Sequence, residues 1–155
     1  MTREQVRPLR YFFSEMLDNI DQHSNAQNAV VSCQYIPKRD YIDVCISDNG
    51  KSIPQSYEEN DIDFDKDYEA VRKALVEGLS TKESDYRGFG LTTNREMVTD
   101  GLDGQVIVCS RNAVVKAAPD GYIVSNIRTW EGTTVIARMY DPDDDFTIYK
   151  YLESK

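Results

Sequence analysis

Residues 41–48, with the sequence YIDVCISD, alternate apolar and polar side chains, and this alternation predicts a β-strand with one buried face. The even positions Ile42, Val44 and Ile46 share the apolar face. Asp48 has the same parity, so we expect its carboxylate to point into the same buried layer if helices cover that face. The Asn-Gly pair that follows indicates, by itself, no more than a turn.

The segment before this strand predicts an amphipathic helix and a further strand. We expect the helix to have Pro8 at its first position and to end between His23 and Asn25. A strand is expected over residues 29–35. The apolar stripe of the helix follows the i, i+3, i+4 spacing and consists of Leu9, Phe12, Phe13, Met16, Leu17 and Ile20.

Acidic side chains crowd residues 55–69, which we interpret as a solvated loop. A calcium loop is excluded there because the required Gly is missing and Arg72 stands at the twelfth position. Helices are expected over 68–80, closed by Gly78, and over 91–101. The remaining chain predicts strands and a short terminal helix, over 105–110, 112–118, 121–126, 132–140 and 141–155 in that order.

This order of elements is not the strand–helix alternation of a doubly wound fold. It predicts an α+β fold, a two-layer α/β sandwich with helices on one face of a mostly antiparallel mixed sheet. No linker or repeat divides the chain, so residues 1–155 are expected to form a single domain. Within it, residues 111–128 resemble an inserted hairpin, which we interpret as sheet or as a docking surface.

The composition narrows the partners and the location. The 155 residues carry a formal net charge of −9, which repels phosphate backbones, so nucleic acid is not an expected partner. No apolar run approaches the roughly 18 residues of a membrane span, and the start resembles no signal peptide, so we expect a cytoplasmic protein without a membrane partner. The cysteines lack metal-ligand spacing and are expected in or beside strands as small apolar residues: Cys33, Cys45 and Cys109.

Three polar residues of the first helix line up along the border of its apolar stripe. Glu15, Asn19 and His23 have the spacing i, i+4, i+8 and therefore form one ridge. An Asn oxygen can ligate Mg²⁺, and a nearby carboxylate can orient or deprotonate a water molecule. Taken alone, the same three residues are more typical of the polar flank of an ordinary helix.

One glycine-containing segment favours an anion such as phosphate, and a second, at the start of the last strand, indicates by itself only a loop-to-strand junction. Gly88 and Gly90 precede the helix that starts near Leu91, where a backbone without side chains and free helix N–H groups favour an anion. No strand is predicted before them, which excludes a Rossmann fingerprint, and no Walker motif occurs. Gly132 and Thr133 open the last strand with a close backbone approach and a hydroxyl.

In this order, these segments resemble the sequence boxes of the GHKL superfamily of gyrase B, heat-shock chaperone, histidine kinase and mismatch-repair ATPases. The similarity extends over about residues 9–139. The N-box resembles EMLDNIDQHS, the G1 box DNGKSI, the G2 box RGFGL and the closing Gly-Thr the pair at 132–133.

The resemblance implies a Bergerat fold in which ATP, with Mg²⁺, lies between helices and sheet. It implies that Asp48 accepts a hydrogen bond from the adenine amino group, assisted by Thr133, that Asn19 ligates Mg²⁺, and that Glu15 acts as a base. The other residues it assigns to the nucleotide are His23, Gly50, Ile53, Lys82, Arg87, Gly88, Phe89, Gly90 and Leu91. One departure is Ser52, which stands where the family has a second glycine in the G1 box. The lone histidine lies in the N-box, which excludes a complete sensor histidine kinase but does not exclude a detached catalytic domain of one.

Three functions remain open from the sequence. The chain could be a small regulatory protein kinase of the anti-sigma type, acting on Ser or Thr of a partner, or a weak ATPase. It could be an ATP-gated interaction module, in which a lid at about 55–86 becomes ordered and binds a protein partner or a second copy. It could also be a scaffold that has lost the nucleotide.

Overall fold

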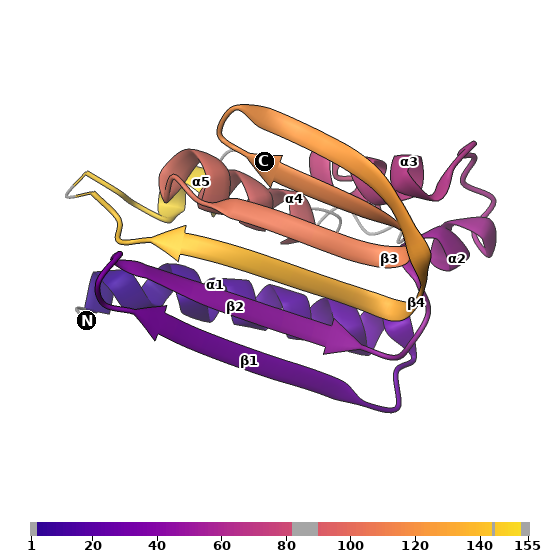
Figure 1. Ribbon diagram of the computed structural model, residues 1–155, viewed down its shortest axis with the longest axis horizontal. Helices are drawn as coiled ribbons and strands as arrows, with labels where there is room; N and C mark the ends of the chain where they lie inside the picture. Colours follow the sequence, from indigo (N-terminus) through magenta and orange to yellow (C-terminus); the bar gives the residue numbers. More distant parts are fainter. Residues whose placement is uncertain (1–2, 82–89, 144, 153–155) are drawn as a thin grey trace.

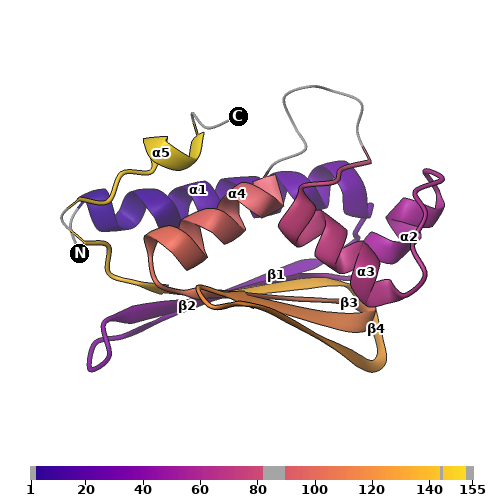
Figure 2. The ribbon, with the colours of Figure 1, turned by 90° about the horizontal axis from the view of Figure 1, so that it is seen from above.

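The computed structural model describes residues 3–81, 90–143 and 145–152. They form two layers, a four-stranded sheet with the order β1-β2-β4-β3 and a layer of helices on one of its faces (Figures 1 and 2). All three described strand pairs are antiparallel. The α+β sandwich predicted from the order of elements is thus confirmed, with an antiparallel sheet throughout the described part.

The helices and strands alternate in blocks along the chain. The sheet is built from β1 (Ala29–Ile36), β2 (Tyr41–Asp48), β3 (Gln105–Ala118) and β4 (Gly121–Tyr140). The α-helices are α1 (Arg3–Asn19), α2 (Ile53–Glu58), α3 (Asp67–Arg72), α4 (Gly90–Glu96) and α5 (Tyr149–Leu152). Wider π-helical turns continue three of them, namely η1 (Ile20–Ser24), η2 (Lys73–Glu77) and η3 (Met97–Gly101).

The alternation in β2 divides that strand as predicted. Ile42, Val44 and Ile46 are buried, and Asp48 is buried on the same face with 7% of its surface exposed. Hydrophobic residues from α1, η2, η3 and both long strands complete the core, among them Phe12, Met16, Leu75, Met97, Val98, Val106, Val108 and Val115. The apolar face of β2 therefore packs into the core, and the Asp48 carboxylate lies at the end of that face.

Two details of the first helix differ from the sequence prediction. Pro8 is not its first residue but lies inside α1, which begins at Arg3. Pro8 is the sixth residue of α1 and so lies beyond the four N-terminal N–H groups that lack a helical partner; it therefore removes one i→i−4 hydrogen bond near the start of the helix. Leu17, assigned to the apolar stripe, is 45% exposed, whereas Phe12 and Met16 are buried as expected. The end of the helical segment at Asn25, in the left-handed conformation, is as predicted.

The four strands expected after residue 104 are two long ones. β3 and β4 pair continuously except for an irregularity between Ser110 and Ala113, where Arg111 adopts a positive φ of 50°. Figure 1 shows both strands bending strongly at this end of the sheet. The polar residues there look like a break in the sequence but form a bulge, which redirects a strand without ending it. The segment 111–128 is accordingly part of the sheet.

The acidic segment 55–69 is not simply a loop, because α2 ends within it and α3 begins within it. Ser52 is the N-cap of α2, and its hydroxyl accepts a hydrogen bond from the Gln55 amide at 3.2 Å. This explains a side chain at the position where the G1 box has a glycine, since the capping hydroxyl starts a helix. Gly78 closes the next helical segment with a φ of 70°, as expected.

An arginine at the bulge holds α2 and α3 together. The Arg111 guanidinium donates to both carboxylate oxygens of Asp67 and, at 2.8 Å each, to both oxygens of Glu58. The Asn112 amide adds a hydrogen bond of 3.2 Å to Asp67. These contacts fix both short helices to the bent end of the sheet. Among the described residues, no helix is long and apolar enough to cross a membrane.

Candidate functional site

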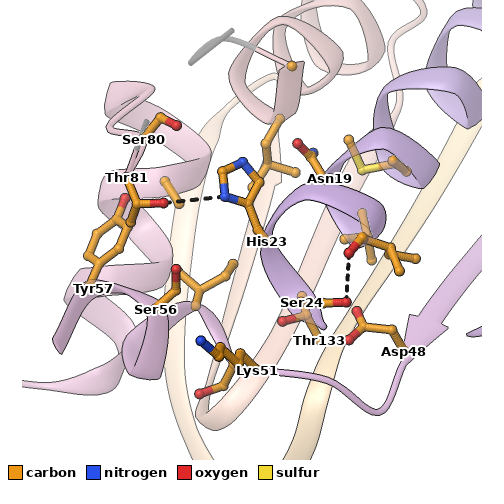
Figure 3. Close-up of a pocket in the computed structure, with 18 of the residues that line it drawn as sticks. Asn19, His23, Ser24, Asp48, Lys51, Ser56, Tyr57, Ser80, Thr81 and Thr133 are labelled. Carbon is orange, nitrogen blue, oxygen red and sulfur yellow. Dashed lines mark hydrogen bonds between the residues drawn. The ribbon is translucent and has the colours of Figure 1, made fainter. Parts of the chain in front are cut away.

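A cavity lies between the helical layer and the end of the sheet, and its space, including the open mouth, is about 860 Å³ (Figure 3). Its walls combine apolar side chains with a small number of polar ones, as small-molecule sites usually do. Residues from α1, η1, β2, α2, η2, the start of α4 and β4 line it. Sequence analysis assigned to a ligand seven of these lining residues, namely Asn19, His23, Asp48, Ile53, Gly90, Leu91 and Thr133.

Asp48 occupies the end of β2 at this cavity. Its Oδ1 accepts a hydrogen bond of 2.8 Å from the Gly50 amide, so the Asp-Asn-Gly turn is closed by the carboxylate itself. Burial raises the pKa of the Asp48 carboxyl, although hydrogen bonds from the Gly50 amide, the Ser24 hydroxyl and the Thr133 backbone act in the opposite direction. None of the ion pairs found within the described residues involves Asp48. A buried carboxylate of this kind gains from a ligand that donates a hydrogen bond.

Two glycines allow the backbone to pack tightly around Asp48. A Cβ on Gly50 would lie 2.2 Å from the carbonyl oxygen of Ser24, and the next amide, of Lys51, donates to that oxygen at 2.6 Å. A Cβ on Gly132 would lie 2.0 Å from the carbonyl oxygen of Asp48. The G1 turn is therefore pressed between the end of η1 and the start of the Gly-Thr strand segment. Gly50 itself contributes shape and an amide rather than a wall of the cavity.

Thr133 faces Asp48 in the register of β2 and β4. Its hydroxyl lies 3.0 Å from the hydroxyl of Ser110, and that same Ser110 oxygen accepts a hydrogen bond of 2.9 Å from the Ile53 amide. The Ser110 oxygen also lies 3.2 Å from the carbonyl of Gly132. One buried serine thus connects the Gly-Thr segment to the first residue of α2, so the floor of the cavity and α2 are positioned together.

The N-box residues follow the helical ridge that the sequence predicted. Asn19 and His23 line the cavity, and Figure 3 shows their side chains above Asp48 and Thr133. His23 Nδ1 lies 3.3 Å from the Thr81 hydroxyl, which connects η1 to the segment after η2. This contact places His23 beside the segment that follows η2, while Asn19 and His23 both line the cavity.

Glu15 lies beside the G2 segment and is not among the cavity-lining residues. A Cβ on Gly90 would lie 2.4 Å from Glu15 Oε2, so this carboxylate is packed against the start of α4. Burial raises the pKa of the Glu15 carboxyl, and the charge of Asp18 raises it further. A carboxylate with a raised pKa is a better proton acceptor, as a general base requires.

Several polar residues of the cavity wall were not predicted from the sequence. Lys51 forms an ion pair with Glu59 beside the cavity, and the Tyr57 hydroxyl donates to the carbonyl of Leu79 at 2.5 Å. The Ser24 hydroxyl donates to the Ile20 carbonyl at 2.9 Å and is also placed to donate to the Asp48 carboxylate. Its single proton serves one acceptor at a time. The other missed polar lining residues are Ser52, Ser56, Ser80 and Thr81. Lys82, Arg87, Gly88 and Phe89, which were predicted to bind ATP, lie outside the described residues.

The fold and the cavity define a two-layer α+β domain with a buried carboxylate at a cavity between the helices and the sheet. A family profile described as histidine kinase-, DNA gyrase B-, and HSP90-like ATPase matches residues 4–142. The chain therefore belongs to this ATPase family, as the sequence boxes implied, and membership supports ATP binding.

Solved structures resemble the chain at low sequence identity. The ATPase region of Saccharomyces cerevisiae topoisomerase II bound to ICRF-187 (dexrazoxane) has a TM-score of 0.51 and 14% identity, covering 95% of this chain and 40% of that one. The 43K ATPase domain of Thermus thermophilus gyrase B in complex with an aminocoumarin has a TM-score of 0.49 and 15% identity, covering 89% and 34%. The chain thus spans between 34% and 40% of these two chains. A comparison with curated proteins found no match.

Proposed function

We propose that this chain binds ATP with Mg²⁺ in the cavity above Asp48 and acts as a small regulatory protein kinase or weak ATPase. The observation that carries the proposal is the buried Asp48 carboxylate, which lines the cavity and pairs with no cation of the described residues. The apolar side chains of Met16, Ile20, Ile46, Ile53 and Val135 line the same cavity. A flat heterocycle with an exocyclic amine fits both the apolar lining and the buried carboxylate, because its faces contact the apolar side chains and its N–H donates to the carboxylate.

The residues above Asp48 suit the phosphate end of the nucleotide. Asn19 would offer its amide oxygen to Mg²⁺, an ion that usually takes one or two protein ligands and keeps phosphate oxygens and water as the others. Bound Mg²⁺ would supply charge neutralisation on the phosphates. His23 and Thr81 would hydrogen-bond at the same end, and Glu15, beside Gly90, would accept a proton from water or from a substrate hydroxyl.

Titration calorimetry with ATP, ADP and GTP, with and without Mg²⁺, tests binding. The proposal expects ATP and ADP to bind and GTP to bind at least about tenfold more weakly, because guanine carries a carbonyl in place of the adenine amine and loses that hydrogen bond. Equal affinity for GTP would contradict the role given to Asp48. Labelled ATP with protein substrates then tests phosphoryl transfer, and Glu15→Gln should reduce transfer or hydrolysis without reducing ATP affinity.

A second function, an ATP-gated interaction module, is favoured by the contacts of the segment after α2. Tyr57, Ser80 and Thr81 line the cavity, and Thr81 contacts His23, so a bound ligand would touch this segment directly. In that case ATP should protect residues 53–81 from proteases while hydrolysis and transfer are absent. A protease pattern that ATP leaves unchanged would remove this alternative.

A further inference from the structure

β1 forms one edge of the sheet, and it is unusually open. It has β2 on one side and, among the described strands, none on the other (Figure 1). Every residue of β1 except Ile36 is exposed, including Val31 and Tyr35 at 47% and 48%. The apolar content of this strand is therefore presented to solvent in the isolated chain.

The backbone of β1 leaves alternate residues directed at this free edge. The Asn49 amide donates to the carbonyl of Asn28 at 3.2 Å, so even-numbered residues make the hydrogen bonds to β2. Hydrogen-bonding direction alternates along an antiparallel strand. The N–H and C=O groups of Val31, Cys33 and Tyr35 consequently point away from β2, ready to pair with a further strand.

The side chains of the same residues lie where the helical layer ends. Val31 pairs with Ile46 and Cys33 pairs with Val44 in the register of β1 and β2. The β2 members are buried under the helices with 2% and 1% of their surface exposed, whereas Val31 and Cys33 are exposed. A strip of apolar surface thus runs along the sheet edge, beside the helices and uncovered by them.

The strand also lacks the usual protection of an exposed edge. Its sequence, AVVSCQYI, contains no charged residue and no proline, although 29% of the chain is charged and its net charge is −9. Natural proteins place lysine, proline or a bulge on edges that must stay unpaired. β1 pairs with β2 in unbroken register along its whole length, so no bulge interrupts it.

We propose that β1 pairs antiparallel with β1 of a second copy of this chain, so that two four-stranded sheets form one continuous sheet across a two-fold axis. With the axis at Cys33, Val31 lies opposite Tyr35 of the partner subunit, a favourable β-branched and aromatic pair. Each chain carries a net charge of −9, so two copies repel each other over most of their surface. Because β1 carries no charge, two copies of this strand can pair without that repulsion.

The charged residues near the two ends of β1 also favour pairing with a second copy of the chain. Asp18 and Asp21 lie on the helical segment that leads into β1, and Lys38 and Arg39 follow β1 in the turn to β2. Antiparallel pairing brings the basic turn of each copy to the end where the other copy's acidic segment enters its strand. The interface requires no nucleotide, so it is separate from the ATP proposal.

The test is the mass of the whole chain in solution, by sedimentation velocity over about 1 to 100 µM, which brackets micromolar association. Wild type should reach twice its 17.8 kDa mass, and Val31→Lys should remain at 17.8 kDa with an unchanged circular dichroism spectrum. Val124→Lys is the matched control, because Val124 is also an exposed valine but lies on β4. It should remain dimeric.

Cross-linking then locates the contact. In a Cys45→Ser, Cys109→Ser background, a short bismaleimide should join Cys33 to Cys33 of the partner subunit, and Val31→Lys should abolish the product. A monomeric wild type across the whole concentration range overturns the proposal. So does a dimer that survives Val31→Lys, dissociates with Val124→Lys or gives no Cys33 cross-link.

Discussion

Gly132→Ala tests how the floor of the cavity is built. The added Cβ would lie 2.0 Å from the carbonyl oxygen of Asp48, and such contacts are essentially never found below 3.0 Å, so the two backbones must separate by about 1 Å. Gly132 also has a φ of 71°, a left-handed conformation that costs an alanine about 1–2 kcal/mol. Overpacking adds roughly 1–3 kcal/mol. We expect the free energy of unfolding to fall by about 2–5 kcal/mol, within the 5–15 kcal/mol typical of a domain.

The same displacement moves Asp48, so ATP binding should weaken as well. Loss of one hydrogen bond to a charged group, about 1.5–3 kcal/mol, corresponds to roughly ten- to a hundredfold in Kd. Gly121→Ala is the control, because Gly121 also has a positive φ, of 126°, but no atom lies within 4 Å of its added Cβ. It should destabilise the fold through backbone strain alone and leave the Kd for ATP unchanged.

Urea denaturation followed by circular dichroism gives the stability of both variants, and calorimetry at a temperature where both are folded gives the Kd. The reasoning is refuted if Gly132→Ala is as stable as wild type, or if it is destabilised yet binds ATP with wild-type affinity.

Arg111→Met should lower the free energy of unfolding by about 2–3 kcal/mol, mostly through Asp67, since the pair with the more exposed Glu58 adds less. Because Arg111 holds the pKa of the Asp67 carboxyl below its usual range, this stabilisation is complete above the unfolded-state pKa, about 3.9, and is lost as the pH falls through the lower folded-state value. Wild type and variant should therefore converge in urea titrations at acidic pH, and a constant difference would contradict the assignment. Asn19→Ala should weaken ATP binding about tenfold in Mg²⁺ and leave binding in EDTA unchanged; calorimetry showing equal losses in both buffers would remove Asn19 as the Mg²⁺ ligand.

The sequence predicted most accurately the features that are written in local spacing. The period-two pattern of β2 placed Asp48 on the buried face, and the helical spacing of Asn19 and His23 placed both on the cavity. Each depends on the geometry of one strand or of one continuous helical segment, which short sequence patterns reflect directly. The order of the elements likewise sufficed for the α+β class.

The missed helix α2 had a local signal that its composition concealed. Ser52 followed by Gln55 is a capping pair, and Pro54 lies in the first turn, which together indicate a helix start. The acidic residues beyond them were interpreted as a solvated loop. Charge composition reports solvent exposure and does not distinguish a short surface helix from a loop.

Other features depend on tertiary contacts and have no short-range signal. Ser110 contacts Thr133, 23 positions later in the sequence, and the amide of Ile53, 57 positions earlier. The bulge at Arg111 is held by acidic residues of two separate helices. From the sequence alone, that bulge was predicted as a break between two separate strands. Such residues become visible only when the elements have been placed together.

The central claim is that the Asp48 carboxylate recognises the base of ATP, and calorimetric titration of Asp48→Asn with Mg²⁺-ATP tests it most directly. The Asn oxygen can still accept from the Gly50 amide, but its NH₂ group then meets the adenine amine with no acceptor. We expect a loss of at least about tenfold to a hundredfold in affinity. Since burial raises the pKa of Asp48, the charged form destabilises the fold at pH 7, so the variant should be at least as stable to urea as wild type. A stable Asp48→Asn protein that binds ATP with wild-type affinity would contradict the account.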